Sequence, residues 1–493
     1  MIHEPQLREE TLDPDDWSEM RALSHRMVDD MFSHLETLRE RPAWQPMPED
    51  VQESFSTPLP HAGQPVGDVY EQFKQNVLAY PMGNPHPRFW GWVMGNGTPL
   101  GMMAEMLAAG LNPNMGGGDH AGSLVELQVI NWCKEMFGYP KEASGLLVSG
   151  GSMANLVGLA VARHARSGFD VREEGVAAAP RPMTIYGSVE MHSSLQRGVE
   201  VLGLGNRFLR RIPVDANFRI DLAALQQAID ADIEQGMKPI CLIGNAGAVN
   251  TGAIDPLNEL ADIASRYGMW FHVDGAFGSL AALSPELRAR LKGMERSDSL
   301  AFDLHKWFYL PFEAGCVIVR DRDAHLRTFT LTPDYLAHGE RGLAGGKVWL
   351  SDYGIQLTRG FKALKVWMAF KTHGVEKIGR LIKQNVDQAS YLAELVEASP
   401  CLELLAPVDL NVVCFRFVMP DMDNQRLDNL NKEILLRLHE SGVAVPSGTL
   451  VRGRYAIRCA ITNHRSRLED FDRLVDEVTR LGEHLVAEGW EPN

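Results

Sequence analysis

Residues 299–320, SLAFDLHKWFYLPFEAGCVIVR, hold a single lysine, Lys306, in a mostly apolar run. A lysine with such neighbours either extends its ammonium group to water or has its pKa lowered by burial, which prepares the amine for chemistry. The apolar residues 299–305 predict a buried strand that ends directly before this lysine. The choice depends on which side chains other strands bring to the same edge of a sheet.

Short apolar runs alternate with helical patterns from about Gly145 onward. Helical periodicity is clear at 221–236 and at 256–268, and the second segment has a proline at its start and a glycine at its end. This alternation predicts an α/β fold, a mostly parallel sheet with helices on both faces and ligands at the carboxyl ends of the strands. The predicted strands are 145–150, 183–188, 239–247, 269–276, 299–305 and 316–320.

Two flanking regions differ from this α/β part. Residues 17–40 carry apolar side chains three or four positions apart and predict an amphipathic helix, whereas the proline-rich residues 41–61 predict an extended connector. Such an arm often lies on a partner subunit. Apolar runs at 411–419 and 455–462 predict a smaller α+β domain. We expect an N-terminal helical arm and dimer-interface segment over 1–98, a large ligand-binding α/β domain over 99–373 and a small C-terminal domain over 374–493.

The composition is that of a globular protein: 493 residues, 45% hydrophobic and 23% charged. A net charge of −16 argues against a broad surface for nucleic acid or anionic lipid. No apolar run approaches the ~18 residues that span a bilayer, and the acidic N-terminus lacks the features of a secretory signal. The six cysteines have no CxxC spacing, which favours reduced thiols over disulfides or a zinc site. We expect a cytoplasmic protein with small-molecule partners and no metal.

A glycine-rich turn, Ser149 to Ser152, follows the first predicted strand. The amides of Ser152, Met153 and Ala154 would begin the next helix, where free N–H groups and the helix dipole favour a phosphate. The turn matches neither GxxxxGK[ST] nor GxGxxG. A tight turn with a serine N-cap explains the same residues, and both interpretations stay open.

Polar side chains follow two other predicted strands. Asp274 ends one of them and precedes Gly275 and Ala276, and His192 lies just beyond another. Alone, each fits a structural role. Together with Lys306 and the glycine-rich turn, the carboxylate, the imidazole and the small residues suit a planar cationic ring with a phosphate arm and a carbonyl. That ligand is pyridoxal phosphate, bound as a Schiff base to the lysine.

These motifs resemble those of the group II pyridoxal-phosphate-dependent decarboxylases, which include aromatic-L-amino-acid, histidine and glutamate decarboxylases. The resemblance extends from about Pro81 to Arg465, and HVDGAFG at 272–278 precedes DLHKW at 303–307 in the family's order and spacing. The motifs are closest to those of aromatic-L-amino-acid decarboxylases. The resemblance implies the fold-type I architecture, an obligate homodimer and active sites near the subunit interface.

The resemblance implies roles for four of the residues above. Lys306 would hold the cofactor as an aldimine, and Asp274 would keep the pyridine nitrogen protonated. His192 would stack on one face of the ring and Ala276 would pack on the other. These four positions define the ring site.

The phosphate site follows from the same resemblance. Ser152, Met153 and Ala154 match the family's phosphate turn, and His305 precedes the lysine as in the family. Asp303 occupies a position where aromatic decarboxylases often carry a phosphate-contacting asparagine. Because a carboxylate repels a phosphate, whether Asp303 faces the phosphate or turns away is open.

Tyr335 lies where the family has a tyrosine on a mobile catalytic loop, and glycines at 339, 342, 345 and 346 suit such mobility. In the family this phenol protonates carbon after carbon dioxide leaves, whereas relatives with phenylalanine form an aldehyde. Tyr335 therefore favours simple decarboxylation. An exposed loop tyrosine is the structural alternative.

The substrate pocket is expected to include Trp92 and His120. Residues 86–97, HPRFWGWVMGNG, resemble the segment whose aromatic residues line the family's side-chain pocket, which favours an aromatic substrate. Glycines 116–118 replace bulkier groups of animal enzymes and suggest a wider or more polar pocket. His120 either contacts the substrate or caps a turn.

We therefore expect decarboxylation of an L-amino acid of tryptophan, tyrosine, phenylalanine or DOPA type to the amine and carbon dioxide. The alternative is an acidic substrate, glutamate, aspartate or cysteine sulfinate, which requires a positive partner; Arg88 is the only arginine in the pocket segment. An aldehyde synthase or a catalytically idle scaffold ranks below both.

Overall fold

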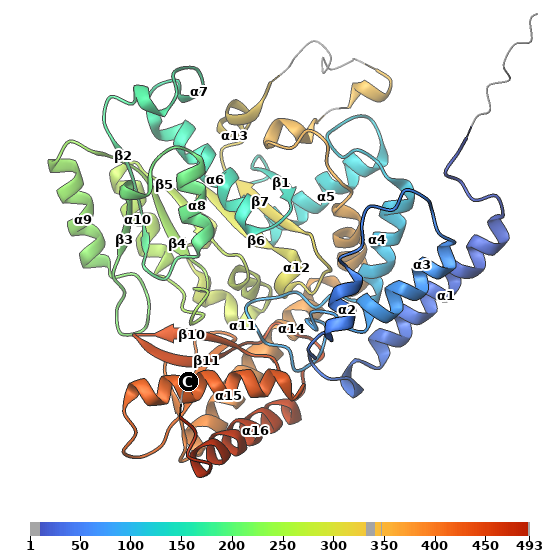
Figure 1. Cartoon of the computed structure of the whole chain (residues 1–493). Helices are drawn as coiled ribbons and strands as arrows, with labels where there is room; N and C mark the ends of the chain where they lie inside the picture. Colours follow the sequence, from blue (N-terminus) through green and yellow to red (C-terminus); the bar gives the residue numbers. More distant parts are fainter. Residues whose placement is uncertain (1–9, 332–340, 347, 492–493) are drawn as a thin grey trace, which may run out of the picture.

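The computed structural model describes residues 10–331, 341–346 and 348–491 (Figure 1). The centre of this part is a seven-stranded sheet in the order β1-β7-β6-β5-β4-β2-β3. β7 pairs antiparallel with β1 and β6, and the other neighbours are parallel, so the predicted mostly parallel sheet is confirmed. The strands are β1 (Ser144–Val148), β2 (Met183–Ser188), β3 (Leu209–Ile212), β4 (Lys238–Asn245), β5 (Trp270–Asp274), β6 (Ser299–Asp303) and β7 (Gly315–Val319).

All six strands predicted for this sheet are present, with ends displaced by a few residues at most. β3 was not predicted. Its sequence LRRI contains two arginines, and only Leu209 and Ile212 are buried at the edge of the sheet. A short edge strand of this kind carries too little apolar signal to be recognised.

Helices cover both faces of the sheet and form two hydrophobic clusters. Because side chains alternate along a strand, Trp270, His272 and Asp274 of β5 point toward α6, whereas Phe271 and Val273 pack on the opposite side. The helices concerned are α6 (Gly151–Ser167) on the first face and α9 (Leu222–Glu234) and α10 (Leu257–Tyr267) on the second.

A second, antiparallel sheet in the order β10-β11-β9-β8 lies in the C-terminal part, below the large sheet in Figure 1. It confirms the predicted α+β character of this part, although β8 and β10 were not predicted. The division at 373/374 stays a prediction. The elements are α14 (Ala363–Ala398, with non-helical angles at Gly374), β8 (Leu402–Leu404), β9 (Val412–Phe417), α15 (Asn424–Glu440), β10 (Ser447–Val451), β11 (Arg454–Ala460) and α16 (Leu468–Ala487).

The N-terminal part begins with the predicted amphipathic helix, which Asp16 caps by accepting from two backbone amides. The segment 41–61 differs from its extended prediction, because Pro48 starts a short helix whose first turn has two acids facing the helix dipole. No helix in the described ranges has the length and apolar character that crossing a membrane requires. The helices are α1 (Trp17–Glu36), α2 (Glu49–Ser54), α3 (Val66–Phe73), α4 (Pro99–Leu111) and α5 (Ala121–Met136).

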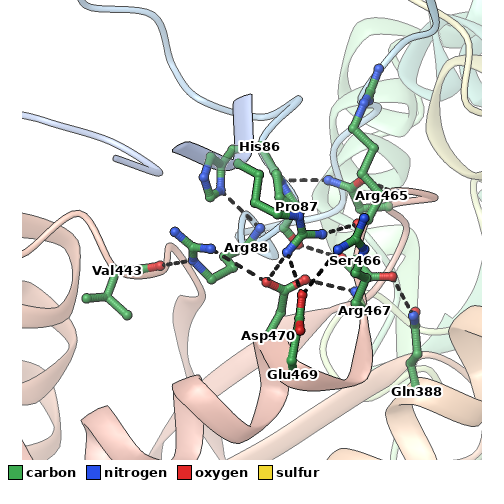
Figure 2. A network of polar contacts seen from close by, with 12 residues as sticks. His86, Pro87, Arg88, Gln388, Val443, Arg465, Ser466, Arg467, Glu469 and Asp470 are labelled. Carbon is green, nitrogen blue, oxygen red and sulfur yellow. Dashed lines mark hydrogen bonds and ion pairs between the residues drawn. The ribbon is translucent and has the colours of Figure 1, made fainter. Parts of the chain in front are cut away.

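A polar network ties this N-terminal part to the start of α16 (Figure 2). Asp470 Oδ1 accepts a hydrogen bond from Arg39 Nη1 at 2.7 Å and lies 3.6 Å from Arg88 Nη1. Asp470 Oδ2 accepts from the backbone N–H of Arg467 at 2.8 Å. Ser466 Oγ donates to the carbonyl of Pro87 at 2.6 Å. The segment that leads to Trp92 is therefore anchored on the C-terminal part.

Candidate active site

Lys306 lies in α12 (Leu304–Trp307), directly after β6. Two adjoining cavities, of about 350 and 240 Å³, meet at this lysine. His192, Asp274 and Ala276 line both cavities together with Lys306. Four residues that the sequence singles out thus surround one space at the carboxyl ends of the parallel strands.

The first cavity is bounded by the glycine-rich turn at the start of α6. Residues 149–153 line it, including Ser152 and Met153, whereas Ala154 is fully buried and does not reach it. The turn has no side chain where Asp303 approaches: a Cβ on Gly151 would lie 2.8 Å from Asp303 Oδ2. Because residues 149–153 line the cavity, the backbone start of α6 faces this space.

Asp303 faces this cavity and is only 1% exposed. Its Oδ2 lies 3.0 Å from Lys306 Nζ and 3.8 Å from His305 Nε2, and its Oδ1 has no hydrogen-bond partner. His305 Nδ1 accepts the backbone N–H of Ala314 at 3.0 Å, and burial lowers the pKa of His305. The carboxylate thus faces the cavity that the glycine-rich turn lines.

Asp274 and His192 are held by hydrogen bonds from buried neighbours. Asp274 accepts from Asn155 Nδ2 at 3.0 Å and from the backbone N–H of Ala276 at 3.1 Å. His192 is the N-cap of α8 (Ser193–Val201), and its Nδ1 accepts the backbone N–H of Ser194. Burial lowers the pKa of His192, although the nearby Asp274 acts in the opposite direction.

The second cavity brings residues of the C-terminal part to Lys306. Trp92, 53% exposed, and Asn245 line it, as do residues 447–449 and Arg458. Arg458 is only 3% exposed and donates hydrogen bonds to the carbonyls of Trp92, Val249 and Asn250. Within the described residues this guanidinium has no carboxylate partner. It leaves an uncompensated positive charge at the cavity wall.

Arg88, the positive group that the sequence offers for an acidic substrate, does not line this cavity. It is buried, near Asp470, and donates to the carbonyl of Val443. Arg458, not Arg88, is the arginine that lines the same cavity as Lys306. The arginine next to the site therefore comes from β11, far from the pocket segment in the sequence.

His120 is not gathered at Lys306 within one chain. His120 lines a separate cavity of about 710 Å³ together with glycines 116–118, and it precedes α5. Tyr335 lies outside the described residues. Both assignments stay predictions.

Among the cavity residues that sequence reasoning missed are Asn155, Asn245 and Arg458. Asn155 is a buried amide on an otherwise apolar helix face, which is a recognisable sign that a polar partner lies opposite. Asn245 ends β4, in the same position in its strand as Asp274 in β5. Arg458 lies within a strand and gave no such sign.

Comparison with known proteins finds the same architecture. The profile of the pyridoxal-dependent decarboxylase conserved domain matches residues 48–418. An aromatic-L-amino-acid decarboxylase of Bacillus atrophaeus is 34% identical, over 95% of this chain and 96% of that protein. The tryptophan decarboxylase of Catharanthus roseus, in complex with L-tryptophan, superposes with a TM-score of 0.86 at 25% identity, over 96% of this chain and 100% of the other.

A third similarity is to the glutamate decarboxylase domain of diaminobutyrate-pyruvate transaminase and L-2,4-diaminobutyrate decarboxylase from Vibrio parahaemolyticus. The TM-score is 0.83 at 26% identity, over 96% of this chain and 97% of the other. The fold expected from the resemblance, that of fold-type I pyridoxal-phosphate enzymes, is thereby confirmed.

Proposed function

This chain belongs to the pyridoxal-dependent decarboxylases, a family of pyridoxal-phosphate-dependent carboxy-lyases, and from that membership we propose that it decarboxylates an aromatic L-amino acid to the amine. The observation that carries the proposal is the convergence of Lys306, Asp274 and His192 on two adjoining cavities. An idle scaffold would not need to keep all three groups around one space.

The residues present fit the cofactor. The backbone amides at the start of α6, in the turn that lines the first cavity, suit a phosphate. Asp274, with both oxygens held by N–H donors, suits a partner for a protonated ring nitrogen. The one poor fit is Asp303, whose unpaired Oδ1 is a carboxylate oxygen on the phosphate side.

Pyridoxal phosphate, when bound, supplies an aldehyde for an amine and a ring that accepts the electron pair left by carbon dioxide. Lys306 is the amine that holds it, and Asp274 keeps its ring nitrogen protonated. His192 and Ala276, which line both cavities, would pack against the ring. The N–H groups of Ser152 and Met153, with His305 in the same cavity, would hold the phosphate, whereas the buried Ala154 lies in the same turn without lining the cavity. Tyr335 is the proton donor to carbon.

An aromatic substrate is favoured by Trp92, a large ring at the wall of the second cavity, and by the enzyme of Bacillus atrophaeus. Arg458 provides the positive charge that orients the substrate carboxylate. The same charge, together with the similarity to the Vibrio parahaemolyticus domain, keeps an acidic amino acid as the second candidate.

We further propose a cytoplasmic homodimer. Helices α1 and α3 lie side by side in Figure 1, joined by contacts such as Tyr70 to Asp30. These two helices and α4 expose large apolar side chains, and contiguous exposed apolar surface often marks a protein–protein interface. A second copy of the chain would cover them and bring His120 to the partner's cavity. The exposed residues are Trp17, Phe32, Val66, Val69, Phe73, Met106, Leu107 and Leu111.

A panel of L-amino acids assayed for carbon dioxide, amine, aldehyde and peroxide tests the reaction. Release of equal amounts of carbon dioxide and amine from tryptophan, tyrosine, phenylalanine or DOPA supports the proposal, and preference for glutamate or aspartate supports the second candidate. Lys306→Ala should lose both the visible band of the bound cofactor and turnover. Turnover by that variant would refute the assignment.

A further inference from the structure

A chain of hydrogen bonds runs from the core to Asp274 and His192, the two side chains that the proposed function assigns to the cofactor ring. Trp270 Nε1 donates to Ser299 Oγ at 2.7 Å, and Ser299 Oγ lies 2.8 Å from His272 Nδ1. His272 Nε2 lies 2.9 Å from Asn155 Oδ1. The chain thus crosses from β5 and β6 to the side-chain amide of Asn155 on α6.

The chain divides at Asn155. Its Nδ2 donates to Asp274 Oδ2 at 3.0 Å and to Ser194 Oγ at 3.1 Å. Ser194 Oγ in turn lies 2.8 Å from His192 Nδ1. One buried amide therefore contacts the Asp274 carboxylate directly and the His192 imidazole through a single hydroxyl.

The direction of each hydrogen bond follows from what these atoms can donate or accept. An ionised Asp274 only accepts, so the NH₂ group of Asn155 faces it and Asn155 Oδ1 faces His272. Since this oxygen only accepts, His272 Nε2 carries the proton. Burial lowers the pKa of His272 to about 3, so the ring is neutral and Nδ1 accepts from the Ser299 hydroxyl. That hydroxyl oxygen accepts from Trp270.

The same reasoning fixes the tautomer of His192. The Ser194 hydroxyl accepts from Asn155, which leaves its own hydrogen to donate to His192 Nδ1. The backbone N–H of Ser194 donates to the same nitrogen at 3.2 Å. A neutral His192 therefore carries its proton on Nε2, the ring nitrogen outside this network. Because His192 lines both cavities, this tautomer decides whether its Nε2 can donate a hydrogen bond to a ligand there.

Helix α6 is shaped around this chain. A Cβ added to Gly158 would lie 2.7 Å from His272 Cε1 and 3.3 Å from Ser299 Oγ, so the missing side chain is the space that the imidazole fills. Asn155 and Gly158 are three residues apart and share one face of the helix. A buried amide and a glycine both weaken the middle of a helix, which indicates a role beyond packing.

We propose that His272 and Asn155 are positioning residues of the decarboxylase site. His272 orients the amide of Asn155, and this amide holds Asp274 as an acceptor for a ring N–H and His192 as the Nε2–H tautomer. The inference rests on the proposed role of Asp274. His272 lines neither cavity, and Asn155, although it lines the first, acts in this role through Asp274 and Ser194.

The test compares the affinity of cofactor-stripped full-length protein for pyridoxal phosphate and for an analogue with carbon in place of the ring nitrogen. His272→Met removes the donor at similar side-chain length, and His272→Gln keeps an N–H at the position of Nε2. We expect His272→Met to bind pyridoxal phosphate about ten-fold more weakly while its affinity for the analogue is unchanged. His272→Gln should bind both ligands like the wild-type protein.

Equal losses for the two ligands would assign His272 to packing alone and overturn the proposal, as would an unchanged affinity for pyridoxal phosphate. If His272→Met does not fold, Ser299→Ala decides, because it removes the hydroxyl that fixes the imidazole tautomer. It should also weaken binding of pyridoxal phosphate selectively, and an unchanged ratio of the two affinities overturns the proposal.

Asp274→Asn separates this inference from the proposed function. If that variant leaves the ratio of the two affinities unchanged, Asp274 is not the partner of the ring nitrogen and the proposed assignment fails. If Asp274→Asn lowers the ratio and the variants of His272 and Ser299 do not, only the positioning role fails.

Discussion

Asp303 places a buried carboxylate beside the amine of Lys306, in the wall of the cavity assigned to the phosphate. Its Oδ2 forms an ion pair with the lysine, whereas its Oδ1 accepts no hydrogen bond. Removing this charge while keeping the shape isolates its effect on the cofactor.

Asp303→Asn is expected to bind pyridoxal phosphate about ten-fold more tightly, because like-charge repulsion disappears and the new amide can donate to a phosphate oxygen. Fluorescence titration of cofactor-stripped protein measures this affinity. Glu313→Gln is the matched control: Glu313 lines the same cavity but is largely exposed, so its charge is screened and its removal should change affinity less than about two-fold. Weaker binding by Asp303→Asn would make the carboxylate a required support of Lys306.

Single residues were predictable from the sequence where they end a buried strand or follow one. Lys306, Asp274 and His192 belong to this group, since parallel strands bring their carboxyl ends to one edge. Asn155 and Arg458 were not predicted, because each acts through a partner distant in sequence: His272 for the amide, and the loop carbonyls at 249 and 250 for the guanidinium.

Among the elements, the start of α16 makes several polar contacts to a segment distant in sequence (Figure 2). Asp470 is 2% exposed there, and two arginines from the N-terminal part approach its Oδ1. The neighbouring acid, Glu469, has a side chain that is 65% exposed and lies 3.6 Å from Arg39. Arg39 thus forms one ion pair with a buried acid, Asp470, and one with an exposed acid, Glu469.

Asp470→Ala should lower the free energy of unfolding by about 3 kcal/mol, because it leaves the buried Arg88 unpaired and removes an acceptor at the helix start. Glu469→Ala should change it by less than about 1 kcal/mol, as expected for an exposed ion pair. Urea unfolding measures both. Similar losses for the two variants would contradict the view that the buried contact holds the N-terminal segment to α16.

Elements were predictable from the sequence where the apolar periodicity was strong, and their prediction failed where it was weak. The six strands of the large sheet and helix α1 belong to the first group. β3, β8 and β10 have few buried side chains, and α2 buries none, so local composition alone could not reveal them.

Acid stability is a property of the whole molecule, to which buried histidines in separate elements contribute, one in strand β5 and one beyond strand β7. His272 and His325 are fully buried, and burial lowers the pKa of each to about 3. A histidine with a lowered folded pKa stabilises the fold fully above its unfolded value of about 6.5. Below that value it loses about 1.4 kcal/mol per pH unit until about pH 3. Asp255 acts oppositely, since burial raises its pKa to about 6 and its contribution is lost as pH rises from 3.8 to 6.

We therefore expect the free energy of unfolding to fall as the pH is lowered from 6.5 to 4.5, and His325→Gln to reduce the slope by about 1.4 kcal/mol per pH unit. Urea unfolding at several pH values provides the measurement. His25 is exposed, so His25→Gln is the control and should leave the slope as it is. An unchanged slope in His325→Gln would mean that this histidine is not neutral in the folded protein.

The proposed homodimer bears on whether the substrate site is complete within one chain. Within one chain His120 lies in a different cavity from Lys306, so a role for His120 at the substrate requires that it enter the partner's site. Co-expression of Lys306→Ala with His120→Ala chains tests this arrangement. In half of the dimers one site then combines an intact Lys306 with an intact His120, which should restore roughly a quarter of the wild-type carbon dioxide release. Each variant alone should be nearly inactive. If both residues act within one chain, every site carries a defect and no activity returns; if His120→Ala alone is fully active, the residue has no role at the substrate.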